Sequence, residues 1–185
     1  MISEITLCMN HGRRTKDVHD LHPSYTFSPG YNALVGPNGF GKTTILSALA
    51  SCDACQKDSH EPVFYMSTES LNPLMSSGHY KNRVENIMAI RAMFSSHGEI
   101  VRDVMSTFGY RGENIFLFDT PETGQDFEQC RLIHSNLQSL VSKGFQVIVS
   151  THEPIFLQNA NIIELKKGYY NHLVSSRMQY LKDLQ

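Results

Sequence analysis

Short apolar runs and longer amphipathic segments alternate along the chain of 185 residues. The apolar runs, which predict buried β-strands, are residues 31–35, 63–66, 115–118 and 145–150. Near the amino terminus Ile5, Leu7 and Met9 alternate with Thr6 and Cys8, which predicts a half-buried strand. A further short strand is expected at residues 25–27.

Helical spacing of apolar residues occurs in several segments between these strands. One helix should begin near Lys42 and carry Ile45, Leu46 and Leu49 on its buried face. Two more helices are expected in the middle of the chain, at 80–94 and 99–108. The segment 126–141 predicts a helix with an apolar stripe, formed by Phe127, Cys130, Ile133, Leu137 and Leu140.

The carboxyl-terminal part predicts a short helix at 154–157, then a hairpin at 161–174 and a short final helix. Helices that alternate with nearly continuous apolar strands predict an α/β fold, in which a mainly parallel sheet is covered by helices on both faces. In such sheets ligands bind at the carboxyl ends of the strands. The length predicts a single domain over residues 1–185.

Composition is that of an ordinary globular protein, with 41% hydrophobic and 18% charged residues. The formal net charge of −2 gives no overall attraction to nucleic acid or membrane, so either partner would need a local patch. No apolar run approaches the ~20 residues that span a bilayer, and MISEITLCMN lacks the layout of a secretion signal. We therefore expect a cytoplasmic protein with reduced cysteines and no membrane partner.

Cys52 and Cys55 form a CxxC pair, and His60 follows closely. As a zinc site this group lacks a convincing fourth ligand, and the sequence has no second CxxC pair. We therefore expect free thiols rather than a metal at this place. His19 and His22 lie in the polar stretch TKDVHDLH and are expected to be solvated.

The stretch GPNGFGKT (36–43) fits the pattern GxxxxGK[ST], directly after a predicted strand and at the start of a predicted helix. The backbone amides of such a loop, together with the helix start, bind a phosphate chain. Lys42 would contact the outer phosphates, the Thr43 hydroxyl would ligate Mg²⁺ and Thr44 would support an inner phosphate. The predicted nucleotide-binding residues here are Gly36, Asn38, Gly39, Gly41, Lys42, Thr43 and Thr44.

Two other strand ends carry candidate catalytic residues. Asp119 would hold the Mg²⁺ directly or through water, and the alternative is that it caps the following segment. His152 would contact the terminal phosphate or orient the attacking water. Two weaker candidates are the basic stretch HGRRTK (11–16), which meets phosphates or is simply solvated, and Tyr25 or Tyr31 as a stacking partner for the base.

Four motifs in a fixed order resemble those of an ABC-type ATPase, and within that superfamily those of the soluble SMC- and RecF-like branch. They are GPNGFGKTT, MSSGH, IFLFDTPETGQD and STH. The resemblance implies a P-loop NTPase fold with a small amino-terminal antiparallel portion, ATP and Mg²⁺ as cofactors, and a homodimer that forms on ATP. It implies that Ser76, Ser77 and Gly78 bind the terminal phosphate of ATP on the partner, and that Asp126 lies at the dimer seam. A helix cap is the alternative at both places.

Two positions depart from the family pattern. Thr120 stands where the family has the acid that polarises the hydrolytic water, so this catalytic position lacks a base, a loss that typically slows a reaction by about 10²–10⁴-fold. Glu122, the second acid of the common DEPE form, and Glu153 are candidate replacements. Residues 67–69 stand where the family usually has a glutamine.

The leading hypothesis is a minimal ABC-type ATPase switch that couples nucleotide state to a partner. By analogy with the branch it resembles, the partner would be DNA or a DNA-processing protein, in processing, repair or defence. Thr120 favours the alternative of a nucleotide-gated binding module with little hydrolysis. A transporter ATPase subunit is disfavoured because residues 45–75 are too few for the helical subdomain of transporters, and a P-loop kinase would not explain His152.

Overall fold

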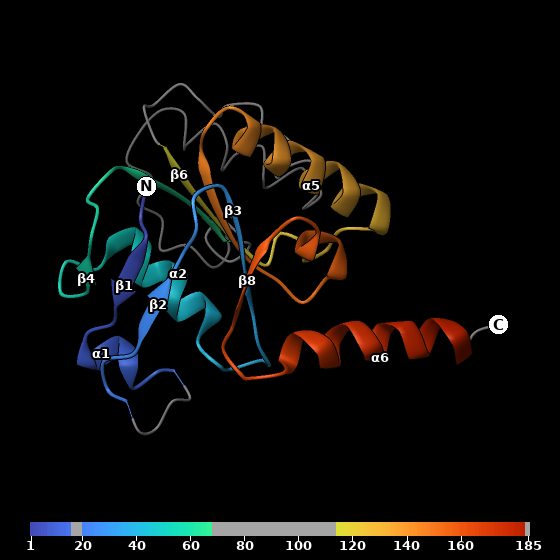
Figure 1. Ribbon diagram of the computed structural model, residues 1–185, viewed down its shortest axis with the longest axis horizontal. Coiled ribbons are helices and arrows are strands. Elements are labelled where there is room, and N and C mark those ends of the chain that lie inside the picture. The colour runs from blue at the N-terminus through green and yellow to red at the C-terminus, as the bar shows by residue number, and fades with distance from the viewer. Residues whose placement is uncertain (16–19, 68–113, 184–185) are drawn as a thin grey trace.

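A five-stranded parallel sheet lies at the centre of the chain (Figure 1). The structure is a computed structural model that describes residues 1–15, 20–67 and 114–183. In spatial order the strands are β5 (Val63–Ser67), β6 (Ile115–Asp119), β7 (Gln146–Ser150), β3 (Tyr31–Val35) and β8 (Asn161–Glu164). All neighbouring pairs are parallel, so the carboxyl ends of the five strands meet at one edge.

Helices α2 (Lys42–Ser51) and α5 (Phe127–Ser142) cover opposite faces of this sheet (Figure 1). Strand β6 shows why both are needed, because its side chains alternate between two apolar clusters. Phe116 and Phe118 pack with the buried residues of α5, whereas Leu117 packs with those of α2. The predicted α/β fold with a parallel sheet covered on both faces is therefore confirmed.

A second, three-stranded antiparallel sheet brings the amino terminus next to the end of α2. Its order is β2 (Ser24–Thr26), β1 (Glu4–Thr6) and β4 (Gln56–Lys57). The expectation that the first strand continues through Met9 is wrong, because helix α1 (Met9–Gly12) begins there and Met9 is 43% exposed. Cys8 is extended, and its carbonyl accepts hydrogen bonds from the backbone N–H groups of His11 and Gly12, which closes the first turn.

The predicted terminal hairpin is also wrong. Strand β8 pairs in parallel with β3, and helix α6 (Tyr169–Asp183) follows it directly. The Glu164 carboxylate accepts hydrogen bonds from the backbone N–H groups of Gly168 and Tyr170, at 3.0 and 2.6 Å, which satisfies the free donors at the start of the helix. Helix α6 projects away from the body of the protein, with its side chains half-buried or exposed throughout the described length (Figure 1).

The predicted stripe on α5 is confirmed at four positions and wrong at the first. Phe127 is 63% exposed, because it is the first residue of the helix, before the helix lies against the sheet. The buried members of the stripe are Cys130, Ile133, Leu137 and Leu140. The short helix at 154–157 is confirmed as the 3₁₀ turn η1 (Pro154–Leu157).

Strand β5 is less buried than its apolar run suggests, because within the described residues it has a neighbouring strand on one side only. The helices expected at 80–94 and 99–108 lie outside the described residues. Among the helices that the structure describes, none combines the length and the apolar character that a membrane span requires.

Candidate nucleotide-binding site

The P-loop joins the carboxyl end of β3 to the start of α2. Gly41 is the N-cap of α2 and has a φ of +96°, a conformation that favours glycine. A Cβ atom at Gly41 would lie 2.9 Å from Cγ2 of Thr15, so the loop also packs closely against the chain that follows α1. The sequence therefore places a glycine where both the backbone angle and the neighbouring residue require one.

Lys42 turns its ammonium group back over the loop. The Nζ atom donates hydrogen bonds to the carbonyl oxygens of Gly36, at 2.8 Å, and Pro37, at 3.1 Å, and the residue is 6% exposed. Burial lowers the pKa of Lys42, and the carboxylates of Asp119 and Glu122 oppose that shift. A buried ammonium whose hydrogen bonds within the described residues go to two carbonyls is well suited to a negatively charged ligand.

Asp119 ends strand β6 opposite Ser150 of β7 and is 4% exposed. One carboxylate oxygen accepts a hydrogen bond from the Ser150 hydroxyl, and the other lies 3.5 Å from the Tyr65 hydroxyl. These partners fix the direction of the side chain at the edge of the sheet. A buried carboxylate beside the P-loop lysine has the chemistry of a Mg²⁺ ligand.

Thr120 adopts a φ of +48°, which is unusual for a β-branched residue. Its backbone N–H donates to both the carbonyl and the hydroxyl oxygen of Ser150, at 3.0 and 3.1 Å. These hydrogen bonds hold the strained backbone in place. The side chain at this position contains no acid, so the structure provides no base here.

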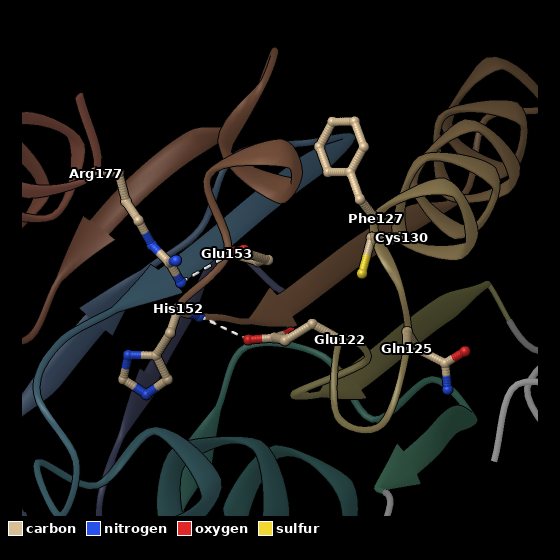
Figure 2. Close-up of a pocket in the computed structure, with 7 residues that line it drawn as sticks. All are labelled: Glu122, Gln125, Phe127, Cys130, His152, Glu153 and Arg177. Atoms are coloured by element: carbon tan, nitrogen blue, oxygen red, sulfur yellow. Dashed lines mark hydrogen bonds and ion pairs between the residues drawn. The ribbon is translucent and has the colours of Figure 1, made fainter. Parts of the chain in front are cut away.

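Glu122 lies beside the backbone of His152 (Figure 2). Its Oε1 atom accepts a hydrogen bond from the backbone N–H of His152 at 2.7 Å, and its Oε2 atom is buried without a hydrogen-bond partner among the described residues. Burial raises the pKa of Glu122, while the hydrogen bond from His152 opposes that shift. Glu122 therefore fixes the backbone of the loop that carries the histidine.

His152 follows strand β7 and is half-buried. Its Nδ1 atom lies 3.3 Å from the hydroxyl of Tyr169, the first residue of α6, and the two rings meet edge to face. Burial and the nearby Lys42 ammonium lower the pKa of His152. The imidazole is thus neutral near pH 7 and can accept a hydrogen bond from water or a phosphate hydroxyl.

One cavity of about 230 Å³ brings the strand-end residues together. It is lined by Arg14, Asn38, Gly39, Gly41, Lys42, Thr43, Thr44, Thr120 and His152. The basic stretch HGRRTK contained the only signal for Arg14, and the fold rather than the motif places that residue here. Asp119 is not among the lining residues, although its carboxylate interacts electrostatically with the Lys42 ammonium. The Thr43 hydroxyl and the Asp119 carboxylate are oxygen ligands suited to Mg²⁺, and Lys42 suits a phosphate chain.

An adjoining cavity of about 290 Å³ shares His152 with the first one (Figure 2). It is lined by Glu122, Gln125, Phe127, Cys130, His152, Glu153 and Arg177. Glu153 forms an ion pair with Arg177 of α6 at 3.3 Å. Glu122 and Glu153, the two candidate replacements for the missing acid, therefore line this second cavity rather than the P-loop cavity.

Other predicted site residues lie elsewhere. Asp126 is the N-cap of α5 and accepts a hydrogen bond from the backbone N–H of Gln129 at 2.8 Å. Tyr31 cannot stack on a base, because it is buried in the apolar cluster under α5 at the opposite end of β3 from the P-loop. Ser76, Ser77 and Gly78 lie outside the described residues.

Comparisons with known proteins identify the fold. A family model described as an AAA domain matches residues 18–61. No curated protein matches the chain in sequence. A bacterial Atm1-family ABC exporter with ATP bound superposes with a TM-score of 0.65 at 16% identity, over 96% of this chain and 42% of the exporter chain. The chain thus spans less than half of that exporter.

Two further solved structures have a similar fold. The dimeric MJ0796, a bacterial ABC transporter cassette, gives a TM-score of 0.59 at 16% identity, over 91% of this chain and 95% of the cassette. The RNase-L inhibitor superposes with a TM-score of 0.56 at 18% identity, over 76% of this chain and 33% of the inhibitor chain. The chain therefore has the fold of an ABC-type ATP-binding cassette.

Proposed function

We propose that this chain is an ABC-type ATPase switch that binds Mg-ATP in the P-loop cavity and hydrolyses it slowly. The observation that carries the proposal is a single cavity in which the P-loop, Thr120 and His152 meet. Three separate strand ends supply these residues, and the edge where they meet is the usual ligand-binding edge of a parallel sheet.

Each residue has a role that its chemistry supports. The ammonium of Lys42 contacts the outer phosphates in place of the two loop carbonyls that it now bonds. The Thr43 hydroxyl and the Asp119 carboxylate hold the Mg²⁺, directly or through water, and Thr44 supports an inner phosphate. His152 accepts a hydrogen bond from the attacking water or the terminal phosphate.

Slow turnover follows from Thr120. A threonine hydroxyl cannot take a proton from water near neutral pH, and losing such a base typically slows a reaction by about 10²–10⁴-fold. Glu122 does not replace it, because it lines the adjoining cavity rather than the P-loop cavity, where its Oε1 atom holds the backbone of His152. The second candidate function, a nucleotide-gated binding module with little hydrolysis, is favoured by the same observation.

The chain acts as a homodimer in this proposal, in the cytoplasm. MJ0796 is a dimeric cassette, and its likeness in fold supports a dimer here. Ser76, Ser77 and Gly78 of one subunit bind the ATP of the other, and Asp126 adds a contact at the seam. DNA or a DNA-processing protein is the partner that we propose for the ATP-bound dimer.

Calorimetry with Mg-ATP tests the binding step. Lys42→Ala should weaken binding at least 100-fold because it removes the buried positive charge at the phosphates. Lys143→Ala is the matched control, since Lys143 is an exposed lysine at the far end of α5. Equal affinities for the two variants would overturn the proposed site.

Steady-state phosphate release separates the two candidate functions. Slow turnover that Lys42→Ala abolishes would support the ATPase, and undetectable turnover in a protein that binds Mg-ATP would support the binding module. Thr120→Glu should increase the rate, because it restores an acid beside the terminal phosphate. No increase would show that position 120 does not face the hydrolytic water.

Sedimentation with Mg-ATP and with Mg-ADP tests the dimer. The proposal predicts a dimer with ATP, which Thr120→Asn should preserve because it leaves the P-loop unchanged. Repeating the run with duplex DNA tests the partner. A monomer under all conditions would contradict the switch, and a dimer that ignores DNA would contradict only the proposed partner.

A further inference from the structure

Three cysteines and one histidine come together where α1 and the residues after α2 lie close to each other. Cys8 is the N-cap of α1 and His11 lies within that helix, whereas Cys52 and Cys55 lie between α2 and β4. The ligand atoms of these four side chains all lie within 4.8 Å of one another. Two short pairs that are more than forty residues apart in sequence, with the spacings CxxH and CxxC, therefore form one group.

The distances within the group match a tetrahedral metal site. The Nδ1 atom of His11 lies 3.3 Å from Sγ of Cys8 and 3.5 Å from Sγ of Cys55. With Zn–S bonds of about 2.3 Å and Zn–N bonds of about 2.0 Å, a tetrahedron requires S···N distances of about 3.5 Å and S···S distances of about 3.8 Å. These two S···N distances thus match the tetrahedral value, and all four ligand atoms lie within 4.8 Å of one another.

The surroundings also suit a metal. The four cysteines of the chain are all free thiols, so no disulfide competes for these sulfur atoms. The backbone N–H of Cys8 lies 3.3 Å from Sγ of Cys55 and donates to it, the kind of contact that stabilises a thiolate ligand. Cys55 is 2% exposed, while Cys8, His11 and Cys52 are half-buried, which leaves a route for an ion.

We propose that Cys8, His11, Cys52 and Cys55 bind one zinc ion in a structural site. Three thiolates and an imidazole at tetrahedral spacing favour zinc over harder cations, which prefer oxygen ligands. Four protein ligands fill the coordination sphere, so the site is closed and has no position for a substrate. His60, the neighbour that the sequence offers as a third ligand, is exposed and is not a member of the group.

The zinc ion would connect the amino-terminal region to the P-loop. It joins α1 to the carboxyl end of α2, the helix that begins at Lys42. The chain leaving α1 then reaches the P-loop, since Thr15 donates to the Gly12 carbonyl at 2.7 Å and lies against Gly41. Arg14, between them, lines the P-loop cavity.

Metal content tests the proposal directly. The full chain, purified under reducing conditions without added metal, should contain one zinc ion per chain by elemental analysis. Replacing the zinc with Co²⁺ should give thiolate-to-cobalt charge-transfer bands and the intense visible bands of a tetrahedral centre. Absence of both zinc and the cobalt spectrum would overturn the proposal, and so would an iron–sulfur chromophore.

Variants assign the ligands. Cys52→Ser and His11→Ala should each lower zinc affinity by at least the 10–100-fold typical of disturbing the surroundings of a metal. Cys130→Ala, which removes the cysteine buried in α5, and His60→Ala should keep full occupancy. Unchanged affinity in both ligand variants would overturn the assignment.

A thiol titration of the unmodified protein covers the case in which a ligand variant does not fold. A mercurial reagent should release one zinc ion as it modifies three thiols, detected with a colorimetric chelator. Release of no zinc would overturn the proposal. Lys42→Ala should retain its zinc, so failure of the nucleotide site and failure of the metal site give different results.

Discussion

The P-loop edge of the parallel sheet and the cysteine–histidine group beside the antiparallel sheet are built in opposite ways. At the P-loop edge each functional residue follows its own apolar strand, and parallel pairing makes the strand ends coincide. The cysteine–histidine group has no such local frame. It exists only because β1 pairs with β4, with Ile5 opposite Lys57, and because α1 packs on α2.

The contrast shows two routes from sequence to site. The motif at 36–43 follows its own strand and opens its own helix, and Asp119 ends an apolar strand, so the sequence could place Lys42 and Asp119 at this edge of the sheet. A site divided between residues 8–11 and 52–55 carries only half of its ligands in each segment. The register of a short antiparallel sheet then decides whether the halves meet.

The largest expected loss of stability comes from a substitution in the core of the parallel sheet. Phe116 is 1% exposed and packs against Phe64 and Phe145, with ring centroids 5.9 and 5.3 Å away. Phe116→Ala should lower the free energy of unfolding by about 3–5 kcal/mol, measured by urea denaturation. Phe127→Ala, at an exposed phenylalanine, should change it by less than about 0.5 kcal/mol. Similar losses in both variants would contradict the burial on which the P-loop edge depends.

A smaller loss of stability is expected where the P-loop packs against the residues that follow α1. Gly41→Ala forces an L-residue into a φ of +96° and places a methyl group 2.9 Å from Thr15. Gly168→Ala has a similar φ of +79° but no atom within 4 Å of the new methyl group. The control should cost about 1 kcal/mol from the backbone alone, and Gly41→Ala about 1–3 kcal/mol more. Equal thermal stabilities would show that the chain after α1 does not press on the P-loop.

Relief of the backbone strain at Thr120 should make the protein more stable. Thr120→Asn replaces a β-branched residue at φ +48° with one that accepts this conformation more readily. We expect the free energy of unfolding to rise by about 0.5–1 kcal/mol. Thr123→Asn, on the same loop at an ordinary φ, should leave it unchanged. A loss of stability in Thr120→Asn would mean that the threonine side chain makes contacts that outweigh its backbone strain.

The smallest effect concerns pH. Burial lowers the pKa of His134 on α5, although the Gln158 carbonyl 3.3 Å from its Nε2 atom opposes the shift. The unfolded chain therefore binds more protons than the folded one, and stability falls as pH decreases below the ordinary histidine pKa of about 6.5. In denaturation curves between about pH 7.5 and 5, His134→Gln should reduce this dependence by about 1 kcal/mol or less.

The same measurement separates the two regions, because acid also protonates thiolate ligands and releases zinc. The His134 contribution should persist in the protein without zinc, since His134 packs against Tyr31 and Phe156 on the α5 face of the sheet. A pH dependence that disappears entirely on removal of zinc would assign it to the metal site instead.

The wrong predictions share a physical cause. Apolar alternation continues through Met9, but the two hydrogen bonds to the Cys8 carbonyl turn the chain into a helix. The run after residue 160 reads as a hairpin, but β3 offers a free edge to β8 and Glu164 caps α6. In both cases the apolar pattern does not encode the backbone hydrogen bonding that the structure shows, and for β8 the strand partner is also distant in sequence.

The sequence by itself determined the parallel sheet, its two covering helices and the residues at its carboxyl edge, because hydrophobic period and motif spacing are local and parallel pairing aligns strand ends. Tertiary structure alone decided that Arg14 joins the P-loop cavity, that Glu122 holds His152, and that CxxH meets CxxC. Those arrangements depend on which distant segments pack together, and packing energy is a property of the whole fold.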